Sequence, residues 1–233
     1  MQNTAKKLRS KLNNEEYPIG TFLKLADPWV LDSVSRTGLD FVVLDNLKGA
    51  YEDTALQEGH RNILAELDLP TLVRLRDSNL ASLPIAKDLS ADGIIVPHAP
   101  DMEQVQAIAQ AYKNTAEDSI LLLECDNAPL YHQMESILQM EAIDGIYINP
   151  EKLRAALQPI KLCGLYDGIA YLKELCRKNN KYCFIYEIGS SGSIAVRFRR
   201  DHFDAVICAS DIRMMSHFYV SILEGVDSIL ADD

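Results

Sequence analysis

The sequence alternates eight times between a short β-rich apolar run and a longer amphipathic segment. Each apolar run has four or five residues, which is the length of a strand, and the segments between the runs have helical periodicity. Parallel strands need a crossover of a dozen or more residues, so this order predicts parallel strands joined by helices. The apolar runs cover residues 19–23, 41–44, 71–75, 93–97, 120–124, 145–148, 182–186 and 205–208. The amphipathic segments cover residues 28–36, 55–67, 80–89, 102–112, 129–140, 165–178, 194–200 and 212–223.

The predicted fold is of the α/β class: a single eight-stranded (β/α)8 TIM barrel with an extra N-terminal helix at residues 5–12 that closes the bottom of the barrel. We expect residues 1–233 to form one domain, because no Gly/Ser-rich or Pro-rich linker divides them. A doubly wound open sheet is the alternative that the same alternation allows.

Charge and hydropathy exclude two classes of partner. The chain has 23 basic and 34 acidic residues, a formal charge of -11, which is the wrong sign for neutralising the phosphates of a nucleic acid. No window reaches the roughly 20 uncharged apolar residues that a membrane span requires. We therefore expect neither a nucleic-acid partner nor a membrane partner.

The N-terminal residues and the cysteines together predict a cytoplasmic protein. Residues 1–14 are polar and basic, without the apolar core of a secretory signal. The cysteines are odd in number and none is in a C-x-x-C pair, which indicates reduced core thiols. They are Cys125, Cys163, Cys176, Cys183 and Cys208.

Polar residues follow most of the predicted strands, and in a barrel the C-terminal ends of the strands form the active-site face. Candidate functional residues are therefore sought at these ends. They lie at 45–49, 74 and 76, 97–98, 124 and 126, 149–152, 187–193, and 210–211.

Several of these strand ends resemble the HpcH/HpaI aldolase and citrate lyase family. The resemblance runs from about residue 8 to residue 225 and rests on the order and spacing of five motifs. They are Leu-Asp-Phe-Val-Val-Leu-Asp-Asn-Leu-Lys-Gly at 39–49, Val-Arg at 73–74, Ala-Asp-Gly-Ile-Ile-Val-Pro at 91–97, the strand end at Glu124, and Asp-Gly-Ile-Tyr-Ile-Asn-Pro at 144–150. It implies a barrel, usually a homo-oligomer, that breaks or forms a carbon–carbon bond next to a pyruvate enolate.

The resemblance also implies a set of site residues. The family holds a divalent cation, Mg²⁺ or Mn²⁺, with a Glu after the fifth strand and an Asp after the sixth, because an enolate is negative and needs cations to meet its charge. An arginine after the third strand and a proton-handling histidine in the second motif complete the family's site. Glu124 matches the metal-binding Glu, and Arg74 matches the arginine.

Three positions depart from the family pattern. The histidine position is Lys48, preceded by Leu47 where the family has Glu, and the metal-binding Asp position is Lys152. The family's long loop before the fifth strand is also shortened, since only seven residues separate Tyr112 from Ile120. Exchanging Asp for Lys removes a negative ligand and adds a positive charge, so we expect weakened binding of a divalent cation.

The exchange suggests that the Lys152 ammonium pairs with Glu124 and occupies the place of the cation. Arg74, Lys48 and Lys152 would then form a metal-free pocket for a carboxylate or phosphate. Lys48 could instead act as a base or as a Schiff-base nucleophile.

The sequence thus predicts a carbon–carbon lyase that acts on a 2-keto acid or related acyl substrate through an enolate, with a small carboxylate as its substrate partner. Arg74 and Lys48 are predicted to be catalytic, Asp45, Asn149 and Lys152 to bind substrate, and Glu124 to hold any metal. The alternative is a diverged, non-catalytic relative that binds a small anion, and a remoter one is a phosphate-binding isomerase or synthase.

Three residue assignments have competing interpretations. Arg74 could be a structural partner of Asp45 or Asp92 instead of a functional group. His98 could transfer a proton, although an ordinary surface imidazole is the favoured interpretation. The Gly/Ser turn at 189–193 could cradle a phosphate or be a plain loop.

Overall fold

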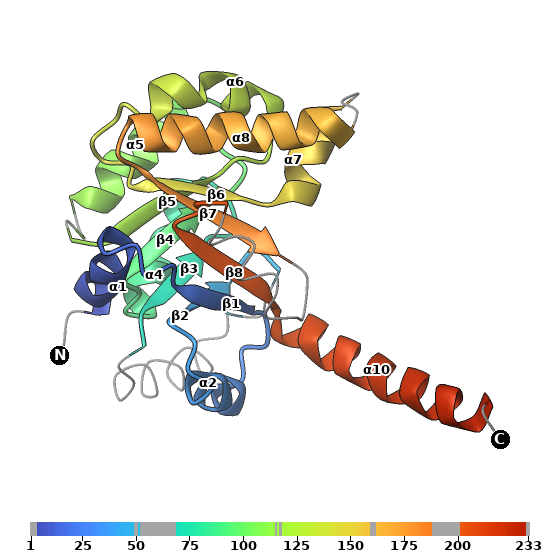
Figure 1. The fold of residues 1–233 in the computed structure, drawn as a ribbon. Helices are drawn as coiled ribbons and strands as arrows, with labels where there is room; N and C mark the ends of the chain where they lie inside the picture. Colours follow the sequence, from blue (N-terminus) through green and yellow to red (C-terminus); the bar gives the residue numbers. More distant parts are fainter. Residues whose placement is uncertain are drawn as a thin grey trace.

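Eight parallel strands close into a barrel in the order β1 to β8, with β1 paired to β8 (Figure 1). The structure is a computed structural model, and it describes residues 4–48, 51, 69–114, 116, 118–158, 162–187 and 201–231. Closure confirms the predicted barrel and excludes the open sheet. The strands are β1 Ile19–Leu23, β2 Phe41–Asp45, β3 Thr71–Arg74, β4 Gly93–Val96, β5 Ile120–Glu124, β6 Gly145–Ile148, β7 Tyr182–Glu187 and β8 Ala205–Ser210.

Helices follow most of the strands where amphipathic segments were predicted. They are α1 Thr4–Asn13, α2 Pro28–Ser35, α4 Pro84–Asp88, α5 Met102–Lys113, α6 Ala128–Ile137, α7 Pro150–Ala156, α8 Leu162–Lys178 and α10 Asp211–Ala231, with a 3-10 turn η1 at Leu80–Ser82. The predicted helices at 55–67 and 194–200 lie outside the described residues.

Two helix predictions need correction. The single helix expected at 80–89 is divided into η1 and α4, because Pro84 has no N–H to continue a helix and instead opens a new one. Helix α7 was not predicted at all. It has seven residues, and its start is fixed by Asn149, whose side-chain oxygen accepts hydrogen bonds from the amides of Glu151 and Lys152.

Helix α1 closes the bottom of the barrel, as predicted. Leu8 and Leu12 join the core cluster that fills the barrel interior. Polar contacts hold the same helix to residues that precede strands: Thr4 donates a hydrogen bond to Asp92, and Arg9 forms an ion pair with Asp144 at 2.8 Å. The opposite end, where the strands have their C-terminal residues, is called the mouth here.

Helix α10 extends away from the barrel (Figure 1). Its first part, as far as residue 224, is exposed along almost its whole length, apolar side chains included. Its exposed apolar residues are Ile212, Met214, Met215, Phe218, Tyr219, Val220, Ile222 and Leu223. In the part of the chain that the structure describes, no helix is long and apolar enough to cross a membrane.

The cysteines whose side chains are described are free thiols. Cys125, Cys176 and Cys183 are buried, as the sequence predicted, and Cys208 is partly buried. The side chain of Cys163 lies outside the described residues.

Candidate active site at the barrel mouth

Arg74 is held by a buried bidentate ion pair with Asp45. The last residues of β2 and β3 are in register, which places the two side chains next to each other at the mouth. Arg74 Nε and Nη2 lie 2.9 and 2.6 Å from the two oxygens of Asp45, and both side chains are almost fully buried. The guanidinium also lies over the Phe22 ring, 4.5 Å from its centroid. Of the two structural partners considered for Arg74, Asp45 is the correct one, since Asp92 lies before β4 at the bottom of the barrel.

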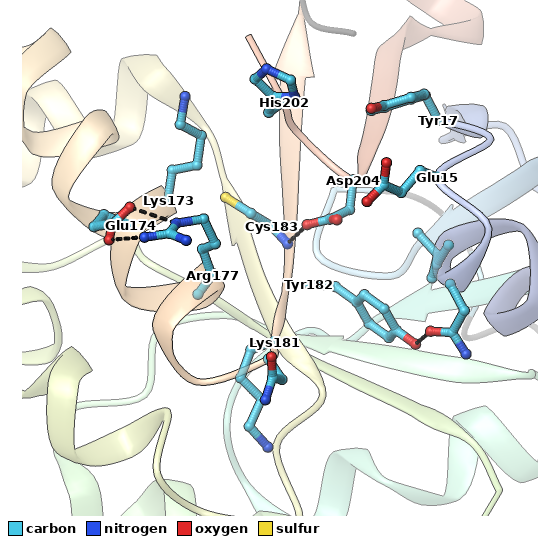
Figure 2. Close-up of a pocket in the computed structure, with 14 residues that line it drawn as sticks. Glu15, Tyr17, Lys173, Glu174, Arg177, Lys181, Tyr182, Cys183, His202 and Asp204 are labelled. Atoms are coloured by element: carbon cyan, nitrogen blue, oxygen red, sulfur yellow. Dashed lines mark hydrogen bonds and ion pairs between the residues drawn. The ribbon is translucent and has the colours of Figure 1, made fainter.

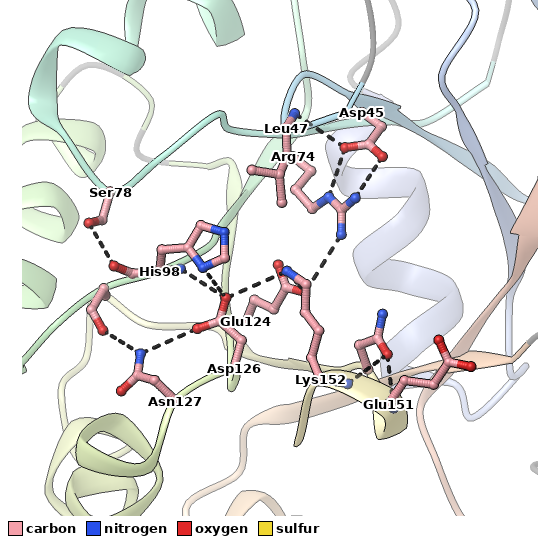
Figure 3. A network of polar contacts seen from close by, with 12 residues as sticks. Asp45, Leu47, Arg74, Ser78, His98, Glu124, Asp126, Asn127, Glu151 and Lys152 are labelled. Carbon is pink, nitrogen blue, oxygen red and sulfur yellow. Dashed lines mark hydrogen bonds and ion pairs between the residues drawn. The ribbon is translucent and has the colours of Figure 1, made fainter. Parts of the chain in front are cut away.

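Glu124 lies between two cations at the end of β5. Its Oε1 is 2.7 Å from Lys152 Nζ and 3.6 Å from Arg74 Nη1 (Figure 3). The predicted pairing of Lys152 with Glu124 is therefore present. The carboxylate is fully buried, and within the described residues its Oε2 has no hydrogen-bond partner. Burial raises the pKa of Glu124, while the charges of Arg74 and Lys152 act in the opposite direction.

Lys152 reaches the mouth from the first turn of α7. The Asn149 cap fixes this turn, so Asn149 has a role in placing Lys152 that the sequence reasoning missed; its contact with substrate stays a prediction. Besides Glu124, the ammonium lies 3.6 Å from Asp126 Oδ2. A positive group therefore stands between two carboxylates that could otherwise serve as metal ligands.

The described residues at the mouth do not form a carboxylate cluster that would fit a divalent cation. Lys152 Nζ occupies hydrogen-bonding distance of Glu124, the one family ligand that this chain retains. Throughout the described ranges, no group of three or more His, Cys, Asp or Glu side chains is arranged to hold a metal ion. Glu124 is thus an ion-pair partner in this structure, not a ligand in a carboxylate cluster.

The structure tests only part of the predicted pocket of Arg74, Lys48 and Lys152. Arg74 and Lys152 are each paired with a carboxylate, so neighbouring groups already balance their charge. The Lys48 side chain is exposed, and it makes no ion pair within the described part of the chain. Its place in an anion pocket, or as a base or nucleophile, stays a prediction.

His98 and Asp126 form a pair that sequence reasoning passed over. His98 Nδ1 lies 2.7 Å from Asp126 Oδ2, and the His98 backbone N–H donates to the same oxygen at 3.1 Å (Figure 3). The Asp126 side chain is 1% exposed and the imidazole 51%, so a buried carboxylate orients a half-exposed ring. The available signal was position: each residue comes two places after the end of a strand, and β4 and β5 are neighbours in the barrel.

A cavity lies at the other end of the barrel, beside the start of β7 (Figure 2). Several of its charged side chains are engaged with protein groups. Arg177 pairs with Glu174 at 2.6 Å, Lys181 Nζ donates to backbone carbonyls, and Asp204 accepts the N–H of Cys183 at 2.7 Å. Among the described residues, the mouth is the better candidate for an active site, since it has a buried carboxylate without a full set of hydrogen bonds and a half-exposed histidine. The Gly/Ser turn at 189–193 lies outside the described residues.

Comparison with known proteins finds similarity to aldolases. It is 23% identical over 178 residues to a hydroxypyruvate/pyruvate aldolase of Pseudomonas aeruginosa, covering 65% of this chain and 66% of that protein. It is 20% identical over 175 residues to a 2-keto-3-deoxy-L-rhamnonate aldolase of Salmonella gallinarum, covering 63% and 64%. The matches thus span about two thirds of the length of these relatives. No family model matches the chain.

A solved structure extends the similarity to nearly the whole chain. An HpcH/HpaI aldolase/citrate lyase family protein from Burkholderia cenocepacia superposes with a TM-score of 0.81 at 15% identity, covering 95% of this chain and 99% of that one. The aldolase relatives confirm the resemblance drawn from the strand-end motifs, and the solved structure confirms the barrel.

Proposed function

We propose that this chain is a carbon–carbon lyase of the aldolase type that acts on a 2-keto acid or related acyl substrate, with the Lys152 ammonium in the role of the divalent cation. The similarity to aldolases supports the reaction class. The observation that carries the altered mechanism is the 2.7 Å contact between Lys152 Nζ and Glu124 Oε1. Glu124, which matches the metal-binding Glu of the family, pairs with Lys152 in this chain.

Aldol cleavage produces an enolate oxygen with negative charge, and the mouth has two cations that could stabilise it. In aldol cleavage the bond between C3 and the carbinol carbon breaks, its electron pair passes to the 2-keto oxygen, and an aldehyde leaves as its hydroxyl loses a proton. The resulting pyruvate enolate is then protonated at C3. Arg74 and Lys152 are the cations beside Glu124 that could stabilise the enolate oxygen. An ammonium has half the charge of Mg²⁺, so we expect slower turnover than a metal site would give.

The alternative is a non-catalytic relative that binds a small carboxylate or phosphate. The observation that favours it is charge balance, since Asp45 neutralises Arg74 and Glu124 neutralises Lys152 before any ligand arrives. Such a protein would still bind an anion, for example through the exposed Lys48. Binding alone does not separate the two proposals, but formation of pyruvate does.

Calorimetric titration with oxalate, a mimic of the pyruvate enolate, is the first test, in EDTA and in Mn²⁺. We expect the same affinity in both, and we expect Lys152→Met to lose it while Lys178→Met, an exposed lysine, does not. Binding only with Mn²⁺ would contradict the role given to Lys152. Release of pyruvate from a 4-hydroxy-2-keto acid, followed with lactate dehydrogenase, then tests for a lyase.

We also propose that the protein is a homo-oligomer, with α10 in its interface. A row of exposed apolar side chains on one helix exceeds what a monomer usually presents, and Phe218 and Tyr219 are 62% and 66% exposed. Sedimentation velocity of the wild-type protein should give a mass above that of one chain. Phe218→Asp with Tyr219→Asp should lower the mass, and Lys87→Asp, on the exposed side of α4, should not. A monomeric wild-type protein would contradict this proposal.

A further inference from the structure

Asp126, at the mouth, is a buried carboxylate whose nearest ionisable partner is a histidine. Asp126 is 1% exposed and lies just after β5. Its Oδ2 accepts from the His98 backbone and contacts the His98 ring, and its Oδ1 accepts from Asn127 Nδ2 at 3.3 Å. Burying a carboxylate is unfavourable unless it is paired, and here the imidazole is its nearest ionisable partner.

His98 itself is held in an uncommon backbone conformation. Its φ is 55°, in the left-handed region that non-glycine residues rarely adopt. Three contacts fix it there, since the Ser78 hydroxyl donates to the His98 carbonyl at 3.2 Å in addition to the two contacts with Asp126. Backbone conformations of this kind persist only where the surroundings hold them, and they concentrate at functional sites.

The contacts fix the imidazole at one nitrogen and leave the other one available. Nδ1 faces Asp126, and no hydrogen bond or ion pair to Nε2 is present among the described residues. A carboxylate on one nitrogen sets the tautomer and orients the ring, so that the other nitrogen can accept and return a proton. The ring is half exposed, so a small substrate can reach it.

The pair of His98 and Asp126 lies next to Lys152 and Glu124, whose contact supports the proposed function. Asp126 Oδ2, which contacts His98, also lies 3.6 Å from Lys152 Nζ, which in turn pairs with Glu124. One carboxylate therefore stands next to both the imidazole and the ammonium. This arrangement places a proton-transfer group beside the position assigned to the enolate oxygen.

We infer that His98 is the general acid–base of this site and that Asp126 is its positioning residue. The inference rests on the proposed function and specifies it further: His98 Nε2 takes the hydroxyl proton as the aldehyde leaves and returns a proton to C3 of the enolate. It assigns proton transfer to the end of β4, whereas the histidine position of the second-strand motif is the exposed Lys48 in this chain.

Exchange of the pyruvate methyl protons in D₂O, followed by proton NMR, tests this step without an aldehyde. The base removes a proton from C3 to give the enolate, and a deuteron from solvent replaces it. We expect His98→Asn to slow exchange by roughly 100-fold or more, the usual contribution of a general base. Asparagine tolerates a positive φ, so the loop should survive the substitution. His202→Asn is the matched control, since His202 is exposed and has a φ of 59°.

Chemical rescue separates proton transfer from a structural role. Glycine also accepts a positive φ, so His98→Gly should fold, and added imidazole should restore its exchange. Asp126→Asn should slow exchange without rescue by imidazole. A structural role for His98 would give a defect that imidazole leaves unchanged, and this result would overturn the inference.

Binding distinguishes failure of the inference from failure of the proposed function. If the wild-type protein does not bind oxalate at all, the proposed function fails and the inference with it. If it binds oxalate and exchanges pyruvate protons, but His98→Asn exchanges them equally fast, only the inference is overturned. Oxalate affinity within about twofold of wild type in His98→Asn, together with lost exchange, is the expected result.

Discussion

The barrel has one set of aspartates just before its even-numbered strands and a second set of carboxylates at the ends of β2 and β5 or just after them, and the two sets differ in burial and in partners. At the bottom, each aspartate accepts a backbone N–H from near the start of the preceding strand. The four contacts are Asp40 with Ile19 at 2.8 Å, Asp92 with Thr71 at 2.8 Å, Asp144 with Leu121 at 2.7 Å and Asp204 with Cys183 at 2.7 Å. The repetition indicates a structural device that ties neighbouring strands together.

At the mouth all three carboxylates have an ionisable side chain as partner, and at the bottom Asp40 and Asp144 combine such a partner with their backbone contact. Asp45 pairs with Arg74, Asp126 with His98, and Glu124 with Lys152. All three carboxylates are at most 1% exposed, whereas the bottom carboxylates of Asp40 and Asp144 are 25% and 13% exposed. The mouth thus combines deeper burial with groups that can change protonation or partner.

The difference teaches how one residue type serves two purposes in one fold. A carboxylate that accepts backbone N–H groups stabilises the closed sheet, and a ligand would add nothing to it. A buried carboxylate with an incomplete set of hydrogen bonds, as at Glu124 Oε2, is unfavourable for stability, and such sites concentrate where ligands bind. Substitutions at the two ends should therefore separate stability from binding.

Lys152→Asp should give the largest effect, because it exchanges the cation at the mouth for a third carboxylate beside Glu124 and Asp126. We expect Mn²⁺ affinity to rise by at least two orders of magnitude, since divalent cations prefer clustered carboxylate oxygens. Calorimetric titration with Mn²⁺ measures the change. Lys113→Asp, which alters a lysine that pairs with Asp144 at the bottom, is the control that should not gain a site. Equal Mn²⁺ affinity in the wild type and in Lys152→Asp would contradict the comparison.

Arg74→Met should produce the largest loss of stability. It removes one partner of a buried bidentate pair and leaves Asp45 and Glu124 facing each other without the guanidinium. Breaking such a pair typically costs about 3–5 kcal/mol in the free energy of unfolding, which urea denaturation measures. Combining it with Asp45→Asn should recover part of the loss, because the uncompensated charge is removed. A single variant within about 1 kcal/mol of wild type would show that the pair contributes little.

Asp144→Asn should reduce stability by a smaller amount and leave binding unchanged. Asp144 pairs with Arg9 of α1 and Lys113 of α5, both at 2.8 Å, and accepts the N–H of Leu121. Asparagine keeps an acceptor but loses the charge, so we expect a loss of about 1–3 kcal/mol in urea denaturation. Oxalate affinity should equal that of wild type. A loss of affinity would mean that the bottom of the barrel contributes to binding after all.

The fold was predictable because short local patterns in the sequence, repeated along the chain, determine where the strands and helices lie. Apolar runs of strand length, each followed by a helical pattern, placed all eight strands to within about two residues of their observed ends. Helix α7 escaped because seven residues are too few for a periodic signal, and its start depends on the Asn149 cap. The aspartates before the even strands are visible in the sequence, but their shared role emerges only once the strands are paired.

The site was predictable only where a substitution changed a charge. A lysine at a family carboxylate position points to an ion pair, and the Lys152 contact with Glu124 follows from it. The pair of His98 and Asp126 joins residues 28 positions apart, and single-sequence patterns do not report which strand ends face each other. The predicted anion pocket of Arg74, Lys48 and Lys152 stays a prediction, since two of these cations are paired with carboxylates and the Lys48 side chain is exposed.

Asp92→Asn should give the smallest effect, a change in how stability depends on pH. Burial raises the pKa of Asp92 above its ordinary value of 3.8, against hydrogen bonds from Thr4 and Thr71 that lower it. The folded chain therefore holds this proton to a higher pH than the unfolded chain does, and its contribution to stability is lost as pH rises through the folded pKa. Wild type should lose stability relative to Asp92→Asn as the pH rises above the ordinary Asp pKa of 3.8, as measured by urea denaturation.

Asp77 provides the control of opposite sign for this last measurement. The hydrogen bond from Ser82 lowers the pKa of Asp77 below 3.8, so its contribution to stability is present above that value and is lost only in stronger acid. The difference between wild type and Asp77→Asn should therefore stay flat over the range in which the difference for Asp92→Asn changes. A flat difference for both variants would show that the bottom carboxylate is ionised as easily in the folded chain as in the unfolded one. Asp92 would then stabilise the barrel at neutral pH without an opposing cost of burial. Burial would still raise the pKa of Glu124, so the two ends of the barrel would differ in this respect.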